Sequence, residues 1–211
     1  MAVRLGDVVP KLLATQLDLK RCPHCNVDTP TLAWVGWQLE SGNFDNSRKR
    51  YWRSYRCARC GGVVTGAAPG WDHEATELYP SGTDIDGAIP ERARAYLDQA
   101  VNSLNSPAGA VMLAASAVDA MLKAKNLKDG SLFARIDQAA ANHLITPEMA
   151  AWAHEVRLDA NDQRHADEAV ALPAPVDAKR AVDFALALAQ FMFVLPARVQ
   201  RGIADAKTQQ Q

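Results

Sequence analysis

Four cysteines constrain the fold of this chain more than any other feature of its sequence. They occur as two C-x-x-C pairs, Cys22 with Cys25 and Cys57 with Cys60, and 31 residues separate the pairs. Two such pairs can present four thiolates to one metal ion in a tetrahedral arrangement. A single C-x-x-C can be a redox motif, but no strand–helix–strand pattern surrounds either pair. We therefore predict a structural Zn²⁺ site, with four free thiols or two disulfides as the alternative.

The segment between the cysteine pairs predicts two β-strands. The sequences "TLAWVGWQLE" and "RYWRSYRC" are rich in β-branched and aromatic residues, and they flank the polar turn "SGNFDNS". Two strands with a cysteine pair beside each are typical of a zinc ribbon, whose core is too small to fold without its metal. His24 lies inside the first pair, and with four cysteines present we expect it not to bind the metal.

Basic and aromatic residues are interleaved in the second of these predicted strands. The stretch "SRKRYWRSYR" places arginine and lysine beside tyrosine and tryptophan, a combination that suits a nucleic-acid backbone and unpaired bases. Alternatively, the aromatic residues cover a small core and the charges solvate an edge strand. The candidate nucleic-acid contacts are Arg48, Lys49, Arg50, Trp52, Arg53 and Arg56.

The charges are distributed unevenly along the chain. Residues 1–60 carry ten Lys/Arg against five Asp/Glu, and residues 61–211 carry thirteen against nineteen. This asymmetry indicates two modules with different surfaces. The sequence contains neither a long uninterrupted apolar run nor a signal peptide at its start, so we expect a cytoplasmic protein that does not associate with membranes.

The remaining sequence is predicted to be helical. The chain is 48% hydrophobic but only 7% aromatic, which favours a core of alanine, leucine and valine. The periodicity predicts helices over residues 90–104, 106–126, 131–144, 146–165 and 176–199. We therefore predict the α+β class. A zinc ribbon with an N-terminal extension would occupy residues 1–66, followed by a linker over 67–89, a five-helix bundle over 90–202 and a flexible tail over 203–211.

One row of polar residues in the fourth predicted helix identifies a family. Arg157, Asn161 and His165 recur every four residues, beside the apolar stripe of that helix. A ribbon, then the dipeptide Tyr79–Pro80, then a bundle carrying R-x-x-G-N-x-x-x-H resembles the domain of unknown function 4145 family. That family is a branch of the HEPN superfamily of nucleotide- and RNA-associated helical domains. The resemblance covers about residues 20–200.

The resemblance implies a site and a dimer. In active HEPN ribonucleases an arginine and a histidine work across a dimer interface without a metal ion. By this resemblance the candidate catalytic residues are Arg157, Asn161, His165 and Asp119, and the chain forms a homodimer through its helical domain. Three differences from the family and superfamily patterns are Ala160 in place of glycine, Ala115 in place of arginine, and seven residues between the arginine and the histidine.

These differences favour a non-catalytic module that dimerises and binds RNA, DNA or a nucleotide, in defence or stress response. The alternative is a metal-independent endoribonuclease that uses Arg157 and His165. A third hypothesis is purely structural, with the ribbon docking a protein partner.

Overall fold

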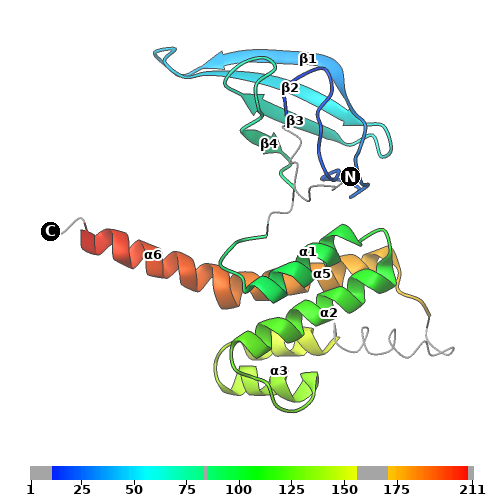
Figure 1. Ribbon diagram of the computed structural model, residues 1–211, viewed down its shortest axis with the longest axis vertical. Helices are drawn as coiled ribbons and strands as arrows, with labels where there is room; N and C mark the ends of the chain where they lie inside the picture. The colour runs from blue at the N-terminus through cyan, green and yellow to red at the C-terminus, as the bar shows by residue number, and fades with distance from the viewer. Residues whose placement is uncertain (1–10, 83–84, 156–170, 209–211) are drawn as a thin grey trace, which may run out of the picture. The chain divides into compact units, whose positions relative to one another are not determined.

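The chain divides between Asp84 and Ile85 into a sheet unit and a helical unit, each with its own hydrophobic core. Figure 1 shows the computed structural model, which describes residues 11–82, 85–155 and 171–208. The predicted α+β class is confirmed, because an antiparallel sheet precedes the helices along the chain. The two units are described separately below.

The sheet has four antiparallel strands in the order β1-β2-β3-β4. β1 (Leu32–Gly42) and β2 (Lys49–Cys57) lie where the sequence predicts strands. Their register shifts between Trp34 and Gln38, around Gly36, whose φ of 86° is in the left-handed region that suits glycine. β1 is therefore bent near its middle.

Part of the predicted linker belongs to the sheet. β3 (Val63–Ala68) pairs with β2, and β4 (Glu77–Tyr79) pairs with β3. In "VVTGAA" the first three residues favour a strand, but Gly66, Ala67 and Ala68 do not, so the second half of β3 depends on its pairing with neighbouring strands. The sheet unit thus continues past residue 66, where the sequence predicts the linker to begin.

The N-terminal extension packs into the core of the sheet unit. Leu13 and Leu17 are completely buried. Backbone hydrogen bonds hold this segment against two parts of the unit: the Leu13 amide donates to the His73 carbonyl at 2.8 Å, and the Leu17 amide donates to the Leu32 carbonyl at 3.0 Å. The extension therefore completes a core too small to be stable from the strands alone. The core residues are Leu13, Leu17, Leu19, Cys22, Leu32, Tyr55, Cys57, Val64 and Ala68.

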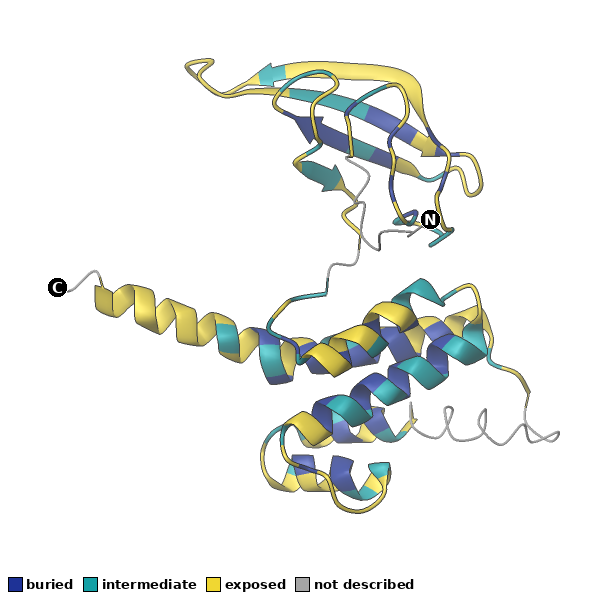
Figure 2. Cartoon of the chain, in the orientation of Figure 1, coloured by how far each residue is buried: buried dark blue, intermediate teal, exposed yellow. Residues whose placement is uncertain are grey.

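Each predicted helical segment contains helix in the described residues. The elements are α1 (Glu91–Asn102), α2 (Pro107–Ala124), α3 (Leu132–Ala141), residues 147–155, and a continuous run of α5 (Pro175–Ala189), η1 (Gln190–Val194) and α6 (Leu195–Thr208). Small residues let α2 lie close to its neighbours, since Ala110, Ala114 and Ala117 are completely buried. Figure 2 shows this buried face along α2.

Two helices are long and apolar enough, by length and composition, to cross a membrane: α2 and the run Pro175–Thr208. Buried residues of α2 and α5 form much of the helical core, including Val111, Met121 and Phe184. Packing inside the unit therefore accounts for much of the apolar content of these two helices.

The last helix widens before a proline. The Leu195 amide donates to the Gln190 carbonyl, five residues back, which makes η1 a turn of π-helix. Pro196 has no N–H for the carbonyl four residues before it, and its ring would clash with that carbonyl in a regular helix. The helix continues to Thr208, through residues predicted to be a tail.

The buried N-terminal extension gives a prediction about stability. We expect Leu13→Ala to lower the free energy of unfolding of the sheet unit by about 2–5 kcal/mol, because it leaves a cavity in a small core. Leu12→Ala is the matched control, since the side chain of Leu12, next to Leu13 in the sequence, is 38% exposed. Chemical denaturation followed by tryptophan fluorescence measures both variants. Equal, small effects would contradict a structural role for the extension.

Candidate metal centre and outer sheet face

The four cysteines converge on one point. Each offers one sulfur, and these atoms all lie within 4.8 Å of one another. The Cys22 and Cys60 Sγ atoms are 3.9 Å apart. A tetrahedral site with metal–sulfur bonds of about 2.3 Å requires sulfurs about 3.8 Å apart. None of these four cysteines, all in the described part of the chain, forms a disulfide. The cluster therefore has the donors and the geometry to hold a metal ion.

Two turns with the same backbone pattern present the sulfurs. In the first, the Asn26 amide donates to the Cys22 carbonyl at 2.9 Å, and the Cys22 amide donates to the Val27 carbonyl at 3.1 Å. In the second, the Gly61 amide donates to the Cys57 carbonyl at 2.9 Å, and the Cys57 amide donates to the Gly62 carbonyl at 2.9 Å. Asn26 and Gly61 occupy equivalent positions and both have positive φ, 55° and 75°.

His24 lies beside the cluster rather than in it. Its Nε2 is 2.8 Å from the Val63 carbonyl, a hydrogen bond that fixes the ring against the second turn. A Cβ at Gly62 would lie 2.5 Å from this ring, so only glycine permits the approach. The Gly62 amide also donates to Cys60 Sγ at 3.4 Å. The expectation that His24 is not needed as a ligand agrees with this geometry.

The cysteine pKa values are shifted in different directions: those of Cys22 and Cys25 are raised, and that of Cys57 is lowered. Burial raises the pKa of Cys22, and burial together with the neighbouring thiols raises that of Cys25 to about 12. Burial also raises the pKa of Cys57, but hydrogen bonds from the Cys60 and Arg59 amides and from neighbouring thiols outweigh it and bring the value to about 7. One thiolate forms readily while the next is disfavoured. A bound cation removes this repulsion and allows all four to ionise.

The two faces of the sheet differ in chemistry. Directly paired residues in antiparallel strands point to the same face, and neighbours along a strand alternate. Tyr55 and Cys57 point into the core, so Arg50, Trp52 and Arg56 point to the other side. Their cross-strand partners extend this surface, which we call the outer face. Its members are Leu39, Arg50, Trp52, Arg56, Val63, Glu77 and Tyr79.

The outer face is an exposed mixture of aromatic, aliphatic and charged groups. Leu39 and Val63 are each 47% exposed and Tyr79 is 54% exposed. The rings of Trp52 and Tyr79 are neighbours, with centroids 6.2 Å apart and planes inclined by 31°. Trp52 Nε1 donates to Ser41 Oγ at 2.8 Å, which fixes the orientation of the indole. Four members of this face were not predicted to bind, because only strand pairing brings them beside Trp52: Leu39, Val63, Glu77 and Tyr79.

An acidic group restrains one arginine of this face. Arg50 Nη2 lies 3.2 Å from a carboxylate oxygen of Glu77. The other oxygen of Glu77 accepts a hydrogen bond of 2.8 Å from the Tyr79 hydroxyl, which raises the pKa of that hydroxyl. At an exposed site such an ion pair contributes only about 0–1 kcal/mol. Arg50 can therefore exchange Glu77 for an external anion at small cost.

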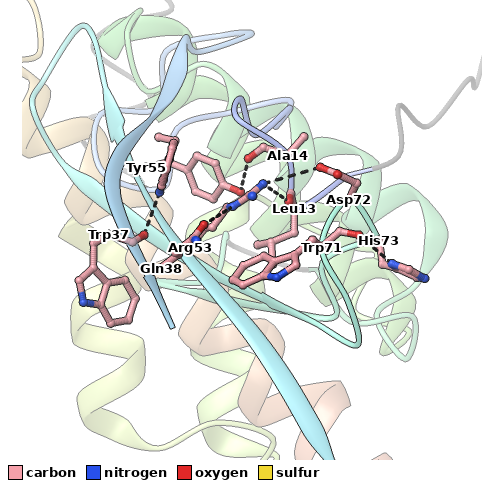
Figure 3. A network of polar contacts seen from close by, with 10 residues as sticks. Leu13, Ala14, Trp37, Gln38, Arg53, Tyr55, Trp71, Asp72 and His73 are labelled. Atoms are coloured by element: carbon pink, nitrogen blue, oxygen red, sulfur yellow. Dashed lines mark hydrogen bonds and ion pairs between the residues drawn. The ribbon is translucent and has the colours of Figure 1, made fainter. Parts of the chain in front are cut away.

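Arg53 has a structural role. Its Nη1 donates to the Leu13 carbonyl at 2.7 Å and lies 3.7 Å from a carboxylate oxygen of Asp72. Its guanidinium lies 4.7 Å from the ring centroid of Trp71 and 5.5 Å from that of Trp34. Figure 3 shows the side chain inside this network. Arg53 thus ties β2 to the N-terminal extension, on the face opposite Trp52.

The other basic candidates lie near the end of the β1–β2 hairpin. Lys49 Nζ lies 2.7 Å from Glu40, an ion pair that raises the lysine pKa, and Lys49 belongs to the same face as Arg53. Arg48 is exposed in the turn. Of the six predicted nucleic-acid contacts, the structure therefore brings Arg50, Trp52 and Arg56 together on one surface.

Of the four predicted catalytic residues, only Asp119 lies within the described residues. Arg157, Asn161 and His165 lie outside the described residues. Asp119 is described, and its two carboxylate oxygens lie 2.6 Å from Arg135 Nη2 and 2.6 Å from Lys123 Nζ. Arg135 is buried and comes from α3, so it supplies Asp119 with a cation that Ala115 cannot provide.

A second polar contact joins α3 to residues 147–155. His154 Nε2 lies 2.9 Å from Asp137 Oδ1, and the His154 ring stacks on Phe133 with centroids 3.9 Å apart. This contact joins α3 to the last described turn of residues 147–155, just before the positions of the Arg157 row in the sequence.

The family model Domain of unknown function (DUF4145) matches residues 95–206, more than half of the chain. The chain belongs to the DUF4145 family. The match confirms the resemblance to this family. It covers nearly all of the helical unit, whereas the ribbon precedes it. Neither the curated proteins nor the solved structures give a match to this DUF4145 chain.

The cysteine geometry gives a test of the metal centre. We expect purified protein to contain zinc, Cys57→Ser to lose it, and His24→Ala to retain it, as measured by atomic spectrometry. Chelation should unfold the ribbon and shift its tryptophan fluorescence to longer wavelength, while the helical circular dichroism persists, because the two units have separate cores. Loss of zinc in both variants would instead make His24 a ligand.

Proposed function

We propose that this DUF4145 protein binds single-stranded nucleic acid on the outer face of a zinc-stabilised ribbon. The observation that carries the proposal is the pair formed by the half-buried Trp52 and the exposed Tyr79, neighbours on the face that also presents Arg50 and Arg56. Unpaired bases stack on aromatic rings, and phosphates bind arginine. Both kinds of group are present on one open surface.

The all-thiolate donor set supports zinc as the metal. Four cysteine sulfurs near tetrahedral spacing are typical of a closed structural zinc site, in which no coordination position remains for a substrate. Zinc would join the turn before β1 to the turn after β2, and so hold the strands that carry the outer face. Its role in this proposal is to stabilise the ribbon.

The spacing of the arginines favours a strand over a compact ligand. Arg50 and Arg56 are six residues apart on β2, which corresponds to about 20 Å at ~3.3 Å per residue. Trp52 lies between them in sequence. An extended chain of nucleotides can contact all three residues, whereas a mononucleotide cannot reach both arginines.

Glu77 competes with phosphate for Arg50. Any phosphate that approaches Arg50 must compete with the Glu77 carboxylate, and Arg56 has no ion-pair partner among the described residues. Arg56 would therefore provide the first phosphate contact, with Arg50 engaging as Glu77 is displaced.

The stacking role of Trp52 can be measured with labelled single-stranded RNA and DNA. We expect Trp52→Leu to weaken binding about fivefold to a hundredfold, because losing a stacked base costs about 1–3 kcal/mol. Phe44→Leu is the matched control, since Phe44 is fully exposed in the β1–β2 turn and off the outer face. Fluorescence anisotropy measures both, after zinc content shows that each variant is folded. Equal loss in both variants, or no binding by the parent protein, would contradict the proposal.

The competition at Arg50 gives a prediction in the opposite direction. We expect Glu77→Gln to strengthen binding severalfold, since it frees Arg50 and removes a negative charge from the face. Glu40→Gln makes the same charge change beside another basic residue, Lys49, on the opposite face. Affinity measured at several salt concentrations should also show a steeper salt dependence in Glu77→Gln, because one more phosphate contact releases counterions. An equal gain from Glu40→Gln would mean that net charge alone controls binding.

A further inference from the structure

α6 carries an apolar row that is exposed and that no described residue of the helical unit covers. Leu195 is 45% exposed, and Val199 and Ile203 are each 53% exposed. None of the α6 residues is buried. α6 continues the run of α5 and η1, but helical stability in proteins comes mainly from packing an apolar face, and this face of α6 is exposed. A surface that covers this row would therefore stabilise the end of the chain.

The residues around the row have a specific order. Leu195, Val199, Gly202 and Ala206 follow the alternating spacing of four and three residues that forms the seam of two packed helices. The two larger residues come first and the two small ones last. Pairing this helix with a parallel copy would place small beside small and leave a gap. An antiparallel copy instead pairs a large residue with a small one in each layer of the seam: Val199 with Gly202, and Leu195 with Ala206.

The charged residues beside the seam are also complementary in the antiparallel arrangement. Arg198 and Asp205 lie seven residues apart, on one flank of the seam. In an antiparallel pair this flank faces its own equivalent, so Arg198 of each copy meets Asp205 of the other. Neither residue has an ion-pair partner within the part of the chain that the structure describes. On the opposite flank, Ile203 meets Pro196.

We propose that two copies of this chain associate through antiparallel packing of their α6 helices. This proposal goes beyond the nucleic-acid function and does not depend on it, because α6 belongs to the helical unit. The interface is isologous, since every contact occurs twice around a two-fold axis that passes between Gln200 and Arg201.

Gly202 is explained by this packing. A Cβ at Gly202 would have nothing within 4 Å in the single chain, so neither a turn nor an internal contact requires glycine there. Glycine also weakens a helix interior relative to other residues. In the antiparallel pair it leaves room for Val199 of the second copy, and larger side chains would push the helices apart.

The association is expected to be reversible. Each α6 contributes fewer residues than the roughly 20–30 per partner of a standard interface, so we expect a dissociation constant on the order of micromolar. Sedimentation velocity of the full chain from about 1 to 300 μM covers the transition from monomer to dimer.

Charge exchange tests the pairing directly. Arg198→Asp and Asp205→Arg should each be monomeric across this range, because each places like charges opposite one another. An equimolar mixture of the two variants should dimerise, since every contact then joins an arginine to an aspartate. Arg201→Asp is the matched control: it makes the same charge change on the far side of α6 and should leave dimerisation unchanged. Gly202→Gln should weaken the dimer at least tenfold while the helical circular dichroism is retained.

Two results would overturn the proposal. One is a parent protein that stays monomeric at the highest concentration. If α6 of that monomer also resists proteolysis, another part of the same chain covers the row, and the proposal is equally wrong. The other is a dimer that neither single charge reversal weakens. Restoration in the mixed sample supports the proposal, because only contacts between copies can produce it.

Discussion

The convergence of four cysteine sulfurs is the constraint on which the ribbon depends. The two turns that present them lie far apart in the sequence, and their union closes a loop that contains β1 and most of β2. The core beneath is small and includes two of the cysteines themselves. A metal ion held by these four sulfurs would offset the entropy of ordering the loop and relieve the repulsion between thiolates. The outer face depends on the same cluster, because the cysteine pairs flank β1 and β2, and pairing of β2 with β3 and of β3 with β4 places Trp52 beside Tyr79.

The sequence predicts the parts of the ribbon that local chemistry determines. The spacing of the cysteines predicts their cluster, and β-branched and aromatic residues predict β1 and β2. β3 was not predicted because the strand preference of Val63, Val64 and Thr65 is followed at once by a glycine and two alanines, which form a strand here only by pairing with β2. The structural role of Arg53 could be inferred from period-two alternation with Tyr55, but its contacts with Leu13 and Trp71 come from distant segments. Such tertiary contacts leave no local signal in one sequence.

The helical unit shows the same division between local and tertiary information. Cap residues and apolar periodicity predict the helices, and the family match covers this unit. The partner of Asp119 could not be predicted, since Arg135 reaches it from another helix. The predicted site row of Arg157, Asn161 and His165 lies outside the described residues and stays a prediction. α6 differs from the other helices because no described residue of the helical unit covers its apolar row, and its residues match their own antiparallel copy.

The central claim is that single-stranded nucleic acid binds the outer face, and the five tryptophans of the chain allow one spectrum to test it. In a proton–nitrogen correlation spectrum of the zinc-loaded protein, each indole N–H gives its own signal. Titration with a short single-stranded oligonucleotide should move the Trp52 signal and the amides of β2 beside it. The signals of Trp71, on the core face, and Trp152, in the helical unit, should stay in place. Shifts confined to Trp152, or a spectrum that does not change, would contradict the account.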